Sequence, residues 1–220
     1  EGGRRLRSDE AGRAEILMTL ETVQKQVLLG HFGDILSYPD EGLWEHVRAA
    51  ETAVLAPHPE AGVLLANFLL AIKNMTLERV EEVYTSIFDL NATHHPYIGY
   101  QIFGETYRRS VFLVELKEHY RNHSFTAPDN ELADRLSLML KFVSLCGDEE
   151  LVADIVQFGF APSLAKMTRE KEPTVQEPEQ KEYNAYSNVL RALQIVLDVE
   201  LPPAKLFPVL NNAGGNVNVR

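Results

Sequence analysis

The chain has 220 residues, of which 45% are hydrophobic and 24% charged, an ordinary globular composition that needs no disulfide or structural metal to hold a core. Its net charge of −11 and pI near 5.1 argue against nucleic acid or an anionic bilayer as the main partner. Cys146 is the single cysteine, which excludes an intrachain disulfide and a zinc site built on several thiolates.

The N-terminal residues 1–15 are highly charged, and Arg4-Arg5 resembles the start of a twin-arginine export signal. The apolar segment that such a signal requires does not follow, because the acidic pair Asp9-Glu10 comes next. We therefore expect a flexible N-terminal segment. No later stretch reaches the ~18 consecutive apolar residues of a membrane span, so we expect no such span.

Helical periodicity dominates the rest of the chain, because apolar residues recur at spacings of three, four and seven. Prolines, N-cap residues and polar turns divide it into stretches that we predict to be helices. In chain order these are residues 16–39, 40–57, 60–73, 76–88, 99–120, 132–146, 151–167 and 183–199. Since no strand pattern is convincing, the sequence predicts a single all-α, bundle-like domain of about eight helices over residues 16–210.

Two segments lack the apolar residues of a packed helix. Residues 168–182 combine Pro173 and Pro178 with many charges, and we expect a mobile loop that could close over a bound peptide. Residues 211–220 are rich in Asn and Gly, and we expect a disordered tail.

Histidine pairs raise the question of a metal-dependent enzyme. His94 and His95 are adjacent in a polar turn near Asp89, and His119 and His123 share one helical face. However, the sequence contains neither a His-Asp dipeptide nor a Glu-x-x-His triple, which are ligand patterns of common helical metal proteins. We therefore expect no catalytic metal and no cofactor, and an enzyme using the His94/His95 turn stays an alternative.

Acidic and aromatic residues gather around this turn and the helix that follows it. Aromatic rings offer apolar surface and carboxylates pair with arginine, so the cluster suits a peptide with basic residues and an apolar stretch. Composition alone favours the other interpretation, in which the rings are core and the acids are solvated. The residues concerned are Tyr84, Phe88, Tyr97, Tyr100, Phe103, Tyr107, Asp89, Glu105, Asp129, Glu131 and Asp134.

Three motifs in this region resemble those of one protein family. They are Tyr84-Thr-Ser-Ile-Phe-Asp-Leu-Asn91, Pro96-Tyr-x-x-Tyr-x-x-x-Gly-Glu-x-x-Arg108 and Asp129-Asn-Glu-Leu-Ala-Asp-Arg-Leu136. At these positions the chain is similar to the nitrate reductase delta-type (NarJ) branch of the NarJ/TorD/DmsD chaperone family. Ala133 departs from the family pattern, which usually has proline there.

The resemblance implies a TorD/NarJ-like all-helical, cofactor-free chaperone in the cytoplasm. Its partner would be the apo catalytic subunit of a molybdoenzyme of the nitrate reductase and dimethyl sulfoxide reductase superfamily. The chaperone would bind the N-terminal leader or tail of that subunit and support molybdenum cofactor insertion before assembly or export. Cofactor-delivery proteins are further candidate partners, and the chaperone would be a monomer or dimer.

The same resemblance implies where the peptide would bind. Asp89 and Glu105 would pair with leader arginines, Tyr97 and Tyr100 would line an apolar groove, and Arg108 would orient a neighbouring carboxylate. A permanent helical subunit of a complex stays a second alternative to the chaperone. The predicted site residues are Tyr84, Phe88, Asp89, Tyr97, Tyr100, Glu105, Arg108, Asp129, Glu131 and Asp134.

Overall fold

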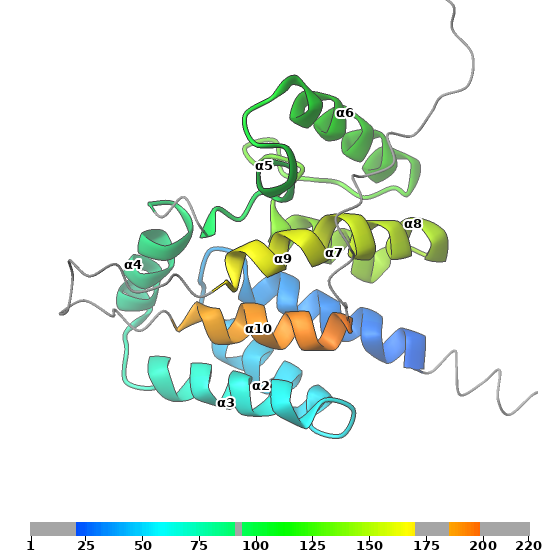
Figure 1. Ribbon diagram of the computed structural model, residues 1–220. Coiled ribbons are helices and arrows are strands. Elements are labelled where there is room, and N and C mark those ends of the chain that lie inside the picture. The colour runs from blue at the N-terminus through cyan, green and yellow to red at the C-terminus, as the bar shows by residue number, and fades with distance from the viewer. Residues whose placement is uncertain (1–20, 91–93, 170–184, 199–220) are drawn as a thin grey trace, which may run out of the picture.

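The structure, a computed structural model, describes residues 21–90, 94–169 and 185–198 (Figure 1). The predicted N-terminal segment and tail, and nearly all of the predicted loop at 168–182, lie outside these ranges.

The all-α prediction is confirmed. Within the described ranges the backbone forms no β-strand, and Tyr97 and Arg135 make only an isolated antiparallel bridge. A helix over residues 21–35 comes first. It is followed by α2 (Leu43–Val54), α3 (Pro59–Ile72), α4 (Leu77–Phe88), α5 (Ile98–Phe103), α6 (Tyr107–Asn122), α7 (Leu136–Leu145), α8 (Glu149–Asp154), the π-helix η2 (Ile155–Phe160), α9 (Ala161–Met167) and α10 (Tyr186–Leu197).

The predicted helix at 99–120 is divided in the structure into α5 and α6. Gly104 follows α5 with a φ of 63°, a backbone conformation that residues with a Cβ rarely adopt. Thr106 is extended and precedes the first residue of α6. Apolar spacing did not indicate this break, because a single glycine or threonine is tolerated within a helical pattern.

Gly159 and Pro162 mark a place where the predicted helix at 151–167 could break. The chain remains helical there but passes through η2, a π-helical segment between α8 and α9. Proline has no N–H to donate, and its ring crowds the carbonyl four residues earlier. The wider turn of a π-helix accommodates both effects without ending the helix.

The core is centred on α10, which packs against α3 on one side and α9 on the other (Figure 1). The ring centroid of Tyr186 lies 4.8 Å from that of Phe68 and 5.2 Å from that of Phe88. Tyr84 lies 4.7 Å from Phe88, and both side chains are buried. The aromatic residues of the first motif are therefore part of the core.

No single described helix is long and apolar enough to cross a membrane. Together α3 and α4 pass that test by length and composition, although they are bent by 120°. In the fold the apolar face of α3, with Leu65, Phe68 and Ile72, is buried in the core.

Candidate functional site

A buried ion pair joins the residue that follows the second motif to the third motif. The Arg109 guanidinium donates from Nε to Asp134 Oδ2 at 2.9 Å and from Nη2 to Asp134 Oδ1 at 3.3 Å. The Asp134 side chain is fully buried and that of Arg109 is 17% exposed. Gly99 makes room for this pair, since a Cβ there would lie 2.7 Å from Asp134 Oδ2. The pair therefore fixes α6 against α5 and the residues that precede α7.

A second arginine connects the third motif to the first. Arg135 pairs with the carboxylate of Glu131, which also accepts a hydrogen bond from the Tyr97 hydroxyl at 3.2 Å. Arg135 Nη2 donates to the Tyr84 hydroxyl at 2.8 Å, and this hydroxyl donates to the Leu36 carbonyl at 3.0 Å. Each polar group in this chain of contacts has a partner, as buried polar groups require.

The electrostatics of these tyrosines follow from burial and neighbouring acids. Burial raises the pKa of Tyr84, and the positive charge of Arg135 opposes this shift. Burial and the negative charge of Glu131 raise the pKa of Tyr97. Asp89 also raises the pKa of both tyrosines, so its exposed carboxylate lies close enough to act on this cluster.

The structure thus sorts the predicted site residues into three groups, which are buried, partly buried and exposed. Tyr84, Phe88 and Asp134 are buried, while Tyr97, Glu131 and Tyr100 are partly buried and the Tyr100 ring centroid lies 5.2 Å from that of His95. The exposed members are Asp89, Glu105, Arg108 and Asp129.

Arg108 is the residue predicted to orient a neighbouring carboxylate. Among the described residues it forms no ion pair with a carboxylate, and the adjacent Arg109 does so instead. On a helix one position changes the direction of the side chain by about 100°. Sequence reasoning missed Arg109 and Arg135, because the sequence did not show that Asp134 is buried and therefore needs a cationic partner.

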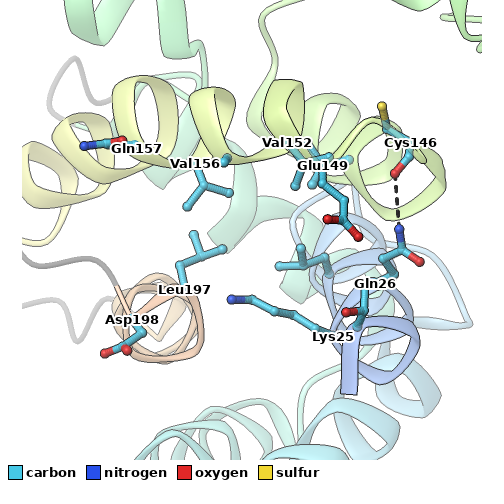
Figure 2. A pocket seen from close by; sticks show the side chains of 13 residues that line it. Lys25, Gln26, Cys146, Glu149, Val152, Val156, Gln157, Leu197 and Asp198 are labelled. Carbon is cyan, nitrogen blue, oxygen red and sulfur yellow. Dashed lines mark hydrogen bonds between the residues drawn. The ribbon is translucent and has the colours of Figure 1, made fainter. Parts of the chain in front are cut away.

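An apolar groove of about 500 Å³ opens on another part of the surface (Figure 2). Its walls come from the helix at 21–35, from the segment from α7 through η2, and from the end of α10. Leu29, Val143, Val152, Val156 and Leu197 are the larger apolar residues that line it. The other lining residues are Thr22, Lys25, Gln26, Cys146, Glu149, Ala153, Gln157 and Asp198.

Charged side chains stand at the edge of this groove. Figure 2 shows the Glu149 and Asp198 carboxylates on opposite walls, with the Lys25 ammonium reaching between them. Gln26 Nε2 donates to the Cys146 carbonyl at 3.2 Å and so joins two of the walls. The Cys146 side chain is buried, and this burial raises the pKa of its thiol.

No residue of the predicted site lines the groove. The sequence gives only a weak signal for the groove. Val152 and Val156 are four positions apart on one helical face, and such an apolar face is normally assigned to the core. The sequence identifies an apolar helical face. Whether a neighbouring helix covers that face fully or leaves part of it open depends on how the helices pack.

The histidine turn has ordinary local contacts. His95 Nδ1 lies 3.3 Å from the Phe88 carbonyl, and neither His94 nor His95 belongs to a described group of three potential metal ligands.

Comparisons with known proteins agree with the motifs. The chain is 27% identical over 138 residues to the nitrate reductase molybdenum cofactor assembly chaperone NarJ of Escherichia coli K12, which covers 61% of this chain and 57% of that protein. It is 28% identical over 127 residues to a protein of Bacillus subtilis designated a probable chaperone of the same type, covering 57% and 68%. The chain thus spans little more than half of the Escherichia coli relative. No protein-family model matches the chain.

A solved structure supports the fold. The crystal structure of a protein from Archaeoglobus fulgidus, described as a redox enzyme maturation protein, matches 80% of this chain and 94% of its own with a TM-score of 0.52. At 22% identity this match concerns the helical fold alone. The sequence relatives confirm the resemblance to NarJ that the motifs indicate.

Proposed function

We propose that this chain, a relative of the NarJ-type assembly chaperones, helps to assemble a molybdoenzyme by binding an N-terminal segment of the apo catalytic subunit. The observation that carries the proposal is the open apolar groove with carboxylates at its edge. The chaperone would hold its partner until the molybdenum cofactor is inserted, would act in the cytoplasm before assembly or export, and would do so by binding rather than by bond chemistry.

The groove suits a short amphipathic helix or extended segment. Its volume of about 500 Å³ falls within the ~300–1,000 Å³ typical of ligand pockets. Apolar side chains of the partner would replace water against Val152, Val156 and Leu197, each buried methylene contributing about 0.8 kcal/mol. This is the helix-in-groove mode of peptide recognition.

Charge would select the partner. Glu149 and Asp198 offer carboxylates to lysine or arginine on a bound segment, while Lys25 would disfavour a segment that is basic throughout. The net charge of −11 accelerates the approach of a basic segment at low salt. A segment with an apolar stretch and a few basic residues fits best.

The exposed residues of the motif region form a second candidate contact surface. Asp89, Glu105 and Asp129 are exposed and so available to cations, and Tyr97 and Tyr100 are partly exposed. We retain the proposal that they bind arginines of the leader. The buried Tyr84, Phe88 and Asp134 would act there only by supporting the exposed residues.

The test begins with capture of the partner from anaerobically grown source cells. A labelled peptide of about 30 residues from the N-terminus of the captured catalytic subunit is then titrated by fluorescence anisotropy. Ala153 is exposed and lines the groove, so Ala153→Arg fills it without disturbing the core. Ala53, exposed on α2, provides the matched control Ala53→Arg.

We expect Ala153→Arg to weaken peptide binding at least ~10-fold, a loss of about 1.4 kcal/mol, and Ala53→Arg to leave it unchanged. The pair Glu149→Gln and Asp198→Asn should weaken binding less, and asparagine tolerates the positive φ of 50° at residue 198. If only Asp89→Ala with Glu105→Ala weakens binding, the chaperone function stands and the groove is the wrong site. Capture of no molybdoenzyme subunit, or presence of the chain in the mature enzyme, contradicts the function itself.

A further inference from the structure

Three side chains with metal-binding atoms converge where the first helix meets α2. His31 and Asp34 lie on the helix at 21–35, and His46 lies near the start of α2. The Nδ1 atoms of His31 and His46 are 3.1 Å apart, and His46 Nδ1 lies 3.4 Å from Asp34 Oδ2. All three ligand atoms lie within 4.8 Å of one another, and no other such group occurs among the described residues.

Local structure explains why these side chains meet. His31 and Asp34 are three positions apart on one helix, so they project from the same face. The turn that leads into α2 is fixed by Asp40, whose Oδ1 accepts a hydrogen bond from the Gly42 N–H at 2.8 Å. His46, four positions further on, then faces the first helix.

The distances match those between ligands of a tetrahedral metal site. With metal–nitrogen and metal–oxygen bonds of about 2.0–2.1 Å, neighbouring ligand atoms are separated by ~3.3 Å. The distances of 3.1 Å and 3.4 Å lie on either side of this value. The third separation, between the ligand atoms of His31 and Asp34, is within 4.8 Å.

A neighbouring lysine positions the carboxylate. Lys141 Nζ of α7 lies 2.8 Å from Asp34 Oδ1, which leaves Oδ2 directed at His46. Lys141 can pass this close to the first helix because Gly33 has no side chain, and a Cβ there would lie 2.8 Å from Lys141 Cγ. Contacts that orient a ligand through its second atom are typical of metal sites.

We propose that His31, Asp34 and His46 bind a divalent transition-metal cation, with Zn²⁺ the best fit. Two imidazole nitrogens and one carboxylate oxygen suit Zn²⁺ and its neighbours, whereas Mg²⁺ and Ca²⁺ prefer ligands that are all oxygen. Water would take the fourth position. The bound cation ties the first helix, which also forms one wall of the groove, to α2.

The test uses the full chain, freed of metal with a chelator and titrated with Zn²⁺ against a chromophoric competitor. We expect one equivalent of Zn²⁺ to bind. His31→Ala and His46→Ala should each weaken this binding by more than ~100-fold, which exceeds the loss expected when a residue that only orients a metal ligand is removed. His123→Ala is the matched control, since His123 also lies near an aspartate, with its Nε2 3.9 Å from Asp148 Oδ2, but is outside the proposed group. It should leave the affinity unchanged.

Cobalt provides a second readout that needs no variant. Co²⁺ bound to the unmodified chain should show the intense visible absorption of a four-coordinate ion, and added Zn²⁺ should remove it. The proposal is overturned if the unmodified chain binds Zn²⁺ no more tightly than His46→Ala, if His123→Ala removes the binding, or if Co²⁺ shows only the weak absorption of a six-coordinate ion.

Discussion

The ion pair between Arg109 and Asp134 makes the sharpest prediction about the fold. Replacing Arg109 with methionine keeps most of the side-chain volume but removes both hydrogen bonds to the carboxylate. The Asp134 side chain is fully buried, so it cannot turn to water for new partners. The variant therefore retains a buried carboxylate without its cation.

The size of the effect follows from this burial. Removing one partner of a buried ion pair costs about 3–5 kcal/mol in the free energy of unfolding. In a domain of this size each kcal/mol shifts the Tm by about 2–4 °C, so a shift of about 6–20 °C is expected. Asp134→Leu combined with Arg109→Met removes both charges, and this double variant should be more stable than Arg109→Met alone.

Urea unfolding followed by far-UV circular dichroism measures both variants. The control is Arg79→Met, because Arg79 and Glu82 form an exposed pair with side chains 57% and 66% exposed, and its loss should cost less than about 1 kcal/mol. The reasoning is refuted if Arg109→Met costs no more than Arg79→Met, or if the double variant is the less stable of the two.

Three further predictions concern packing and titration. Gly99→Ala should lower the free energy of unfolding by about 1–3 kcal/mol, because a Cβ would lie 2.7 Å from Asp134 Oδ2. Gly147→Ala is the control, since a Cβ there meets nothing within 4 Å. Equal stability of the two variants would contradict this prediction. Cys146 should react with iodoacetamide far more slowly in the native protein than in urea, since burial raises its pKa; mass spectrometry showing equal rates would contradict it. Burial raises the pKa of several tyrosines in the folded state but not in the unfolded state. The contribution of these tyrosines to the free energy of unfolding is therefore fully present below pH ~10 and is lost as the pH rises further. In an ultraviolet titration their phenolates should appear at a higher pH in the folded protein than in urea, and ionisation at the same pH in both would contradict this. These tyrosines are Tyr84, Tyr97, Tyr120 and Tyr186.

Local signals in the sequence predicted the helices well. The helix predicted at 76–88 is present as α4 and is capped by Thr76, whose side chain accepts a hydrogen bond from the Arg79 N–H at 3.3 Å. The break at Gly104 was missed because it depends on a positive φ, which the identity of one glycine permits but does not require.

The candidate site was harder to predict for a physical reason. Periodicity places Tyr84 and Phe88 on an apolar face, but only the packed fold shows that α10 covers them through Tyr186. The groove, in turn, depends on the spacing between helices that are distant in sequence. The histidine and aspartate side chains at residues 31, 34 and 46 meet across two helices, and neither helix alone contains a complete ligand pattern.

The most direct test of the central claim is a cross-linking experiment in the source cells. A photoreactive phenylalanine analogue is incorporated at position 153 in the groove or, as the control, at position 53 on α2. After irradiation, mass spectrometry identifies the cross-linked partner and the linked residues. We predict that position 153 links to the N-terminal segment of an apo molybdoenzyme subunit and that position 53 does not. Links from position 153 only to other proteins, or only to the mature enzyme, would contradict the account.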